Sequence, residues 1–136
     1  MNLLFDTNIF LEVILGQSNA KETRELLIKS TLYLSYISDF SIHSIGLLLF
    51  RMAKHKEFID LLSDVRNCGI TIVSVLPEEM FMVTESSVKY GLDFDDSYQY
   101  ALAEKLDAVI VSFDSDFTKT VRGKKTPQEI LGGALL

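Results

Sequence analysis

Short apolar runs alternate along the chain with longer segments in which apolar residues recur every three or four positions. The short runs are typical of buried strands, and they lie at 3–5, 32–37, 70–75 and 108–112. The longer segments predict helices at 8–15, 18–28, 39–50, 56–67 and 96–106, with two more opened by Pro77 and Pro127. This alternation predicts an α/β domain with a mostly parallel central sheet and helices on both faces.

Residues at the expected element ends agree with these boundaries. Gly16 suits the end of the first helix, Ser38 is a suitable N-cap for the third, and Gly69 ends the fourth. No internal repeat or low-complexity linker separates the elements. Because 136 residues that are 48% hydrophobic can bury one core, the sequence predicts a single three-layer domain over 1–136.

The first residues do not resemble a secretion signal. The opening MNLLFDTNIFLEV carries acids at Asp6 and Glu12, so we expect a cytoplasmic protein. The longest apolar region, 32–50, is interrupted by Asp39 and His43 and falls short of an uncharged membrane span. We therefore expect no membrane association.

The composition restricts the kinds of site that this chain can form. A single cysteine, Cys68, cannot form an intrachain disulfide, and with only two histidines beside it a structural zinc site lacks ligands. Any bound metal must therefore be held by oxygen. The net charge of −6 argues against a protein whose main role is to coat nucleic acid, although basic residues cluster at 51–56 and 119–125.

Carboxylates follow two of the expected strands. The run LLF ends in Asp6, and VIVSF ends in Asp114 with Asp116 two residues later. The carboxyl ends of parallel strands lie along one edge of a sheet, and Asp95 and Asp96 come directly before the last long helix. One such acid could serve only as a helix N-cap, but so many carboxylates without matching cations favour a divalent ion. The sequence therefore predicts a site for Mg²⁺ or Mn²⁺.

Three segments resemble the PIN domain, and especially the VapC-type ribonuclease toxins: FDTNIFLEVILG, DDSYQYALAEKLDAVIVSFDSDF and TPQEIL. The resemblance covers nearly the whole chain. Its most specific part is DTN after the first strand, paired with D-S-x-x-x-A-x-A and S-x-D-x-D-F. It implies a PIN-like fold and Mg²⁺- or Mn²⁺-dependent hydrolysis of RNA that leaves 5′-phosphate and 3′-hydroxyl ends. It also implies the toxin of a toxin–antitoxin pair.

The resemblance assigns the site residue by residue. It implies metal binding and catalysis by Asp6, Asp96, Asp114 and Asp116. Polar positions that commonly support the site match Asn8 and Ser112. We also expect a basic run after the acids to contact flanking RNA phosphates, formed by Lys119, Arg122, Lys124 and Lys125.

One position departs from the family pattern. Family members usually carry a glutamate in the helix after the second strand, and here SDFSIHSI places Ser44 at that position. His43 is adjacent in sequence but about 100° away around a helix, so it cannot replace the glutamate, and we expect it to be a core residue. The site then has one negative charge fewer and should need a high Mg²⁺ concentration.

Two alternatives remain open. The stretch FDSDFT matches the D-x-D-x-T signature of haloacid-dehalogenase-like phosphatases, but that fold needs most of its sheet after the motif, and the chain ends soon after Thr118. A catalytically weak PIN-like module that binds RNA or a protein partner is supported by Ser44.

The stretch IGLLLF at 45–50 holds more large apolar residues than one helix face can bury. In similar toxins the equivalent region helps to form a homodimer, so the resemblance implies a homodimer here. In similar toxins the equivalent region also receives an antitoxin helix.

Overall fold

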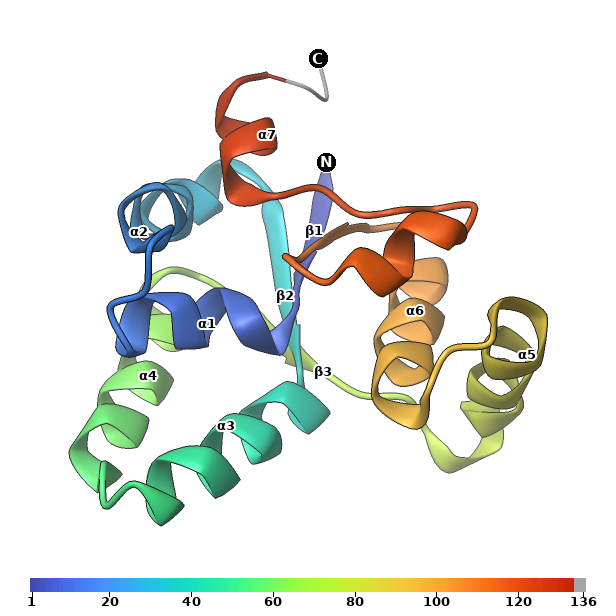
Figure 1. Ribbon diagram of the computed structural model, residues 1–136, viewed down its shortest axis with the longest axis horizontal. Helices are drawn as coiled ribbons and strands as arrows, with labels where there is room; N and C mark the ends of the chain where they lie inside the picture. Colours follow the sequence, from blue (N-terminus) through green and yellow to red (C-terminus); the bar gives the residue numbers. More distant parts are fainter. Residues whose placement is uncertain (134–136) are drawn as a thin grey trace.

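A four-stranded parallel sheet forms the centre of the computed structural model, which describes residues 1–133 (Figure 1). Its order is β3-β2-β1-β4, and every neighbouring pair is parallel. The strands are β1 (Asn2–Phe5), β2 (Leu34–Ser38), β3 (Thr71–Val73) and β4 (Val109–Val111). The predicted α/β class with a parallel sheet is confirmed.

Helices cover both faces of the sheet. They are α1 (Thr7–Ile14), α2 (Ala20–Ile28), α3 (Asp39–Arg51), α4 (His55–Asn67), α5 (Met80–Tyr90), α6 (Phe94–Leu106) and α7 (Pro127–Leu131). Short 3-10 turns precede β2, open α5 and follow β4, at Lys29–Leu32, Pro77–Glu79 and Ser115–Lys119. Figure 1 shows α1 to α4 on one side of the strands and α5 with α6 on the other.

Alternation along β1 divides the core into the two expected layers. Leu3 and Phe5 pack in the cluster that contains Ile9, Ile45 and other residues of α1 to α4. Leu4, between them, points to the opposite face and packs in the cluster formed largely by α6. Strand β1 is therefore buried on both faces, as expected inside a parallel sheet, whereas Thr71 and Ile72 of the edge strand β3 are exposed.

Several boundaries differ from the sequence-based prediction. The strand expected at 32–37 begins only at Leu34, because Lys29–Leu32 form a 3-10 turn. The helix expected at 96–106 begins at Phe94, because the Asp93 side chain accepts a hydrogen bond from the amide of Asp96 and caps the helix. Asp96 is therefore in the first turn of α6 and not before it. The predicted N-cap at Ser38 is confirmed.

Three neighbouring strands end at one edge of the sheet. Phe5 is in register with Ile37 of β2 and Val111 of β4, so the residues that follow are Asp6, Ser38 and Ser112. The amide of Asp6 donates to the carbonyl of Val111 at 2.9 Å, which holds the ends of β1 and β4 together. This edge carries the polar cluster described below.

Two further expectations concern the extent of the chain. The single domain over 1–136 stays a prediction, and residues 134–136 lie outside the described residues. Within 1–133, no helix combines the length and apolar composition needed to cross a membrane.

Candidate functional site

The Asp6 carboxylate is held by neutral donors from three segments of the chain. Its Oδ1 accepts hydrogen bonds from the amide of Thr7 at 2.8 Å and from Nε2 of Gln99 at 2.9 Å. Its Oδ2 accepts from the hydroxyl of Ser112 at 2.6 Å. Because Asp6 is only 8% exposed, these bonds fix the orientation of the carboxylate at the end of β1.

Gln99 connects Asp6 to helix α3. Its Nε2 also donates to the hydroxyl of Ser41 at 2.8 Å, and Ser41 accepts a second hydrogen bond from Thr7. Asp6 Oδ1 can only accept a hydrogen bond. The side-chain amide of Gln99 must therefore direct its Nε2, and not its Oε1, toward Asp6 and Ser41. Its Oε1 is then left buried without a hydrogen-bond partner. An unsatisfied buried oxygen costs stability, which marks Gln99 as a residue constrained by the site.

Three other carboxylates converge beside Asp6. Oxygen atoms of Asp96, Asp114 and Asp116 all lie within 4.8 Å of one another. Asp96 is buried, Asp114 is half-buried and Asp116 is exposed. Asp114 is positioned by its amide, which donates to Ser112 Oγ at 2.9 Å, and its own Oδ1 accepts from the amide of Asp116 at 2.8 Å. Helix α6 and the turn after β4 therefore contribute acids to the same point.

Burial and the nearby carboxylates raise the pKa values of two acids in this cluster. Burial is the main cause that raises the pKa of Asp96 to about 7, and nearby carboxylates add to the effect. In decreasing order these neighbours are Asp114, Asp93, Asp6 and Asp116. The pKa of Asp95 is also raised, first by burial and then by the charges of Asp93 and Asp6. The cluster therefore holds more negative charge than the protein compensates.

Four of these acids line a cleft of about 220 Å³. The lining residues are Asp6, Thr7, Asn8, Leu11, Phe40, Ser44, Asp95, Asp96, Gln99 and Asp114. Ser44 therefore faces the acids, at the place that the resemblance gives to a glutamate. No lysine or arginine of the described chain lines this cleft. We call it the acidic cleft.

A hard divalent cation fits this arrangement of residues. The donors are carboxylate and other side-chain oxygens, which Mg²⁺ and Mn²⁺ prefer, and no lysine or arginine among the described residues lines the cleft to neutralise them. The cluster of Asp96, Asp114 and Asp116 is consistent with the metal site typical of PIN nucleases.

The sequence matches the PIN domain over residues 3–123. The chain belongs to the PIN domain family. The resemblance seen in the sequence is thereby confirmed. The haloacid-dehalogenase alternative is wrong, because FDSDFT follows the last strand of a PIN domain sheet.

Solved structures share the fold of this PIN domain. A toxin–antitoxin complex from Klebsiella pneumoniae matches with a TM-score of 0.72 at 17% identity, over 92% of this chain and 97% of that chain. VapC20 from Mycobacterium tuberculosis, described as a Sarcin-Ricin loop cleaving toxin, matches with a TM-score of 0.70 at 16% identity, over 85% and 92%. VapBC2 from Rickettsia felis, solved with a DNA fragment from its promoter, gives 0.62 at 17% identity, over 92% and 97%. No curated protein gives a significant match.

Asn8 and Ser112 support the cleft of this PIN domain from the side of β4. Asn8 Nδ2 donates to Ser112 Oγ at 3.3 Å, and its Oδ1 accepts from the amide of Phe113 at 3.3 Å. The two residues therefore link the start of α1 to the chain segment that carries Asp114.

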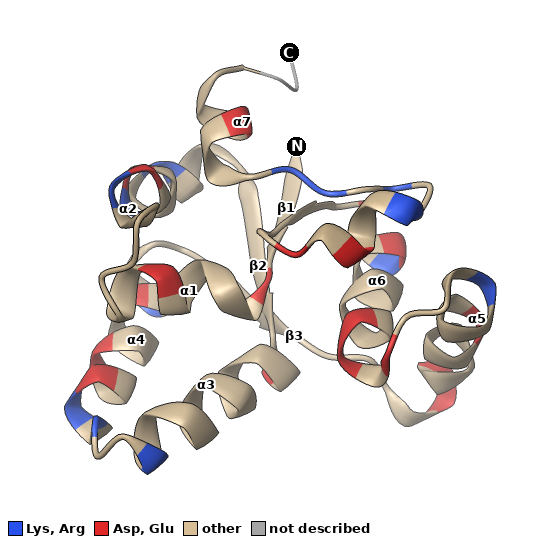
Figure 2. Cartoon of the chain, viewed as in Figure 1, with Lys and Arg blue, Asp and Glu red and all other residues tan. Residues whose placement is uncertain are grey.

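The basic residues after the acids lie outside the acidic cleft. Arg122 donates to the carbonyl of Ala108 and to Asp107 Oδ1, both at 3.2 Å, and so helps to hold the end of α6. Lys119 donates to the carbonyl of Gly91 at 3.4 Å. Figure 2 shows blue positions along the segment that leads to α7, and red positions at the start of α6 and in the turn after β4. Lys124 and Lys125 belong to the segment before α7. Arg122 is thus already engaged in structural contacts.

His43 is not the core residue that we expected. It is exposed and borders a shallow apolar hollow with Gly46, Leu47, Phe50 and Phe58. Successive residues of a helix are about 100° apart around its axis. Ser44 therefore lines the acidic cleft, whereas His43 lies on a different face of α3.

Sequence reasoning missed Gln99 and Ser41. A signal for Gln99 was present, because it lies three residues after Asp96 and so shares its face of α6. Ser41 gave no comparable signal, since its role depends on how α3 packs against α6.

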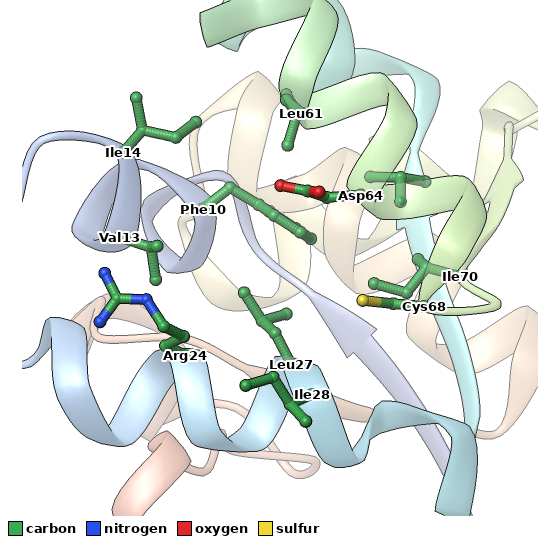
Figure 3. A pocket seen from close by; sticks show the side chains of 11 residues that line it. Phe10, Val13, Ile14, Arg24, Leu27, Ile28, Leu61, Asp64, Cys68 and Ile70 are labelled. Atoms are coloured by element: carbon green, nitrogen blue, oxygen red, sulfur yellow. The ribbon is translucent and has the colours of Figure 1, made fainter.

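A second pocket of this PIN domain is apolar. Figure 3 shows the cavity of about 270 Å³ between α1, α2 and α4, with Phe10, Leu27 and Leu61 among its lining residues. Arg24 and Asp64 are charged residues in its wall. Because Asp64 is the only carboxylate among its lining residues, this cavity does not offer the set of oxygen ligands that a divalent cation needs.

Proposed function

We propose that this PIN domain is a metal-dependent endoribonuclease that hydrolyses RNA phosphodiester bonds, and that it is the toxin of a toxin–antitoxin pair. The observation that carries the proposal is the approach of oxygen atoms of Asp96, Asp114 and Asp116 to within 4.8 Å of one another, at a cleft that Asp6 also lines. The description of Mycobacterium tuberculosis VapC20 as a Sarcin-Ricin loop cleaving toxin supports the substrate class. We also propose that the protein acts in the cytoplasm, where an RNA substrate would be available.

The proposed roles of the acids follow from their exposure. Asp96 and Asp114, buried and half-buried in the cleft, would hold the cation, and Asp6 would complete the negative site. Asp116 is exposed beside them, so we assign it to orienting the attacking water. A bound Mg²⁺ or Mn²⁺ supplies positive charge to the scissile phosphate and lowers the pKa of a water. Gln99 and Ser112 keep Asp6 fixed, so little reorganisation accompanies substrate binding.

A second candidate function is an interaction module with weak catalysis. Ser44 favours it, because this position in the acidic cleft offers a neutral hydroxyl and no charge to a cation. Such a module would bind RNA or a protein without cleaving RNA.

Two partners are proposed besides RNA. The Klebsiella pneumoniae relative was crystallised in a toxin–antitoxin complex, which supports an antitoxin partner for this chain. A homodimer is supported by α3, where Leu47 and Phe50 are 62% and 55% exposed.

The deciding experiment is an RNA cleavage assay on metal-stripped protein. An end-labelled, unstructured RNA is incubated with Mg²⁺ or Mn²⁺, and the products are tested for 5′-phosphate and 3′-hydroxyl ends. We expect cleavage by the wild type and none by Asp114→Asn. Absence of cleavage with either metal, in protein shown to be folded by circular dichroism, would favour the interaction module.

A further inference from the structure

Three aromatic residues form a cluster beside the acidic cleft. The ring centroids of Phe40 and Tyr98 are 5.5 Å apart, those of Phe40 and Phe94 are 5.9 Å apart, and those of Phe94 and Tyr98 are 6.1 Å apart. Phe40 itself lines the acidic cleft, and Phe94 directly precedes Asp95 and Asp96. We call Phe40, Phe94 and Tyr98 the aromatic wall.

Hydrogen bonds hold Tyr98 and Phe40 of the aromatic wall in place. Tyr98 is 4% exposed, and its hydroxyl donates to Asp39 Oδ1 at 2.8 Å and accepts from the amide of Val75 at 2.9 Å. Asp39 Oδ1 also accepts from the amide of Phe40 at 2.8 Å. A ligand that stacks on this wall would therefore lose little free energy to ordering of these side chains.

Phe94 is the exposed member of the wall. Its side chain is 54% exposed, although it is a large apolar ring between charged neighbours. Beyond it lies an apolar hollow of about 450 Å³ between α5 and α6, which Phe94 also lines together with Met80, Val83 and Thr84. Phe94 thus stands between a cleft of carboxylates and an apolar surface.

Basic side chains contribute little affinity for RNA at the acidic cleft. No lysine or arginine of the described residues lines the acidic cleft, Arg122 is paired with Asp107, and the chain has a net charge of −6. Phosphate contacts to basic side chains are the usual source of affinity for nucleic acid. A cation in the cleft would contact the scissile phosphate, and stacking of a base on an aromatic ring is an uncharged contact that would add affinity for the neighbouring nucleotide.

We propose that Phe94, backed by Phe40, is a stacking subsite for an unpaired RNA base next to the scissile phosphate. Only a sugar separates a base from its phosphate, so a phosphate in the acidic cleft brings a neighbouring base to the aromatic wall. A base in a duplex is already stacked and paired, so the subsite selects single-stranded RNA. The proposal rests on the proposed function for its choice of RNA as ligand, but it does not require that RNA is cleaved.

The test measures binding of a short RNA to the full chain. The probe is an eight-nucleotide oligouridine with one central 2-aminopurine and a terminal fluorescein, in buffer with Ca²⁺, and gels verify that it stays intact. We expect Phe94→Ala to weaken binding about tenfold and to remove the quenching of 2-aminopurine that stacking causes. Phe94→Tyr, which keeps the ring, should bind like the wild type. The matched control is Phe81→Ala, because Phe81 is 60% exposed on α5 outside the aromatic wall.

Each outcome decides for or against the subsite. Equal affinity of Phe94→Ala and wild type, equal binding of the RNA and its duplex, or no binding by the wild type overturns it. An equal loss in Phe94→Ala and Phe81→Ala, with a lower mass in light scattering, overturns it in favour of a protein interface. Phe94-dependent binding without cleavage in Mg²⁺ or Mn²⁺ supports the subsite while the nuclease proposal fails. Melting curves establish that all three variants are folded.

Discussion

Gln99 Nε2 donates a hydrogen bond to Asp6 Oδ1 across 2.9 Å, and this contact ties helix α6 to the end of strand β1. Asp96 lies one turn earlier on the same face of α6. The contact therefore sets the separation between two carboxylates that are far apart in sequence. The same orientation of the side chain leaves Oε1 of Gln99 buried without a hydrogen-bond partner, which lowers the stability of the fold.

Gln99→Met should weaken cation binding more than it weakens the fold. Methionine keeps the length of the side chain and removes both donors, so Asp6 is no longer held against α6. We expect about a tenfold loss of Mn²⁺ affinity, measured by calorimetry. Removal of the unsatisfied Oε1 offsets part of the lost hydrogen bonds, so the melting temperature should change by only a few degrees. Unchanged Mn²⁺ affinity would show that Gln99 serves the core and not the cation site.

Asp114→Asn should abolish RNA cleavage and weaken Mg²⁺ binding while the protein stays folded. Asparagine keeps an Oδ1 that can accept from the amide of Asp116, so the turn after β4 retains its cap. Loss of one charge also reduces repulsion at Asp96. Calorimetric Mg²⁺ titration and thermal melting test both parts. Wild-type Mg²⁺ affinity in this variant would refute the assignment of Asp114.

Ser44→Glu should lower the Mg²⁺ concentration needed for half-maximal cleavage. Ser44 lines the acidic cleft, so a glutamate there adds a carboxylate to the cation site. An effect of about 1–3 kcal/mol on binding is reasonable for a partly solvated charge near a cation. Ser44→Gln is the control, because it adds the same size without charge. The wild type should also work better with Mn²⁺ than with Mg²⁺. If metal dependence is the same in both variants and the wild type, Ser44 does not contribute.

The metal-free protein should lose stability as the pH rises from about 4 to about 7. The pKa of Asp96 is raised from 3.8 to about 7 in the folded protein, so over this interval the folded state keeps a proton that the unfolded state has released. The free energy of unfolding therefore falls with pH and levels off above pH 7. We expect the melting temperature to drop by several degrees between pH 5 and pH 8. Asp96→Asn should flatten this dependence, and Mg²⁺ should restore stability at pH 8. A melting temperature in metal-free buffer that rises with pH would contradict the shift.

A homodimer through α3 predicts a mass of twice 15.4 kDa in light scattering at micromolar concentration. Leu47→Lys should convert the protein to a monomer, because Leu47 is 62% exposed on the apolar face of α3. Leu34→Lys is the control, since Leu34 is about as exposed as Leu47 and lies at the start of β2, the end of that strand away from α3. A wild type that is monomeric would refute the proposed dimer.

The fold was predictable because strand and helix periodicities are local properties of the chain. The parallel order of the strands brings the residues after them to one edge, so the approach of Asp114 to Asp6 followed from topology alone. The sequence did not indicate where side chains point across the gap between two elements. Gln99, the exposed position of His43 and the engagement of Arg122 depend on how helices pack, and no local pattern encodes that packing.

The sheet order places the last strand beside the first. Strand β4 pairs with β1, so Asp114 and Asp116 reach Asp6 only after most of the chain exists. On the ribosome, β1 to β3 can form their part of the sheet early, since domains emerge from the N-terminus. A nascent chain that lacks its final strand therefore has no complete acidic cleft. Synthesis itself therefore delays completion of the acidic cleft until the residues that follow β4 have been translated.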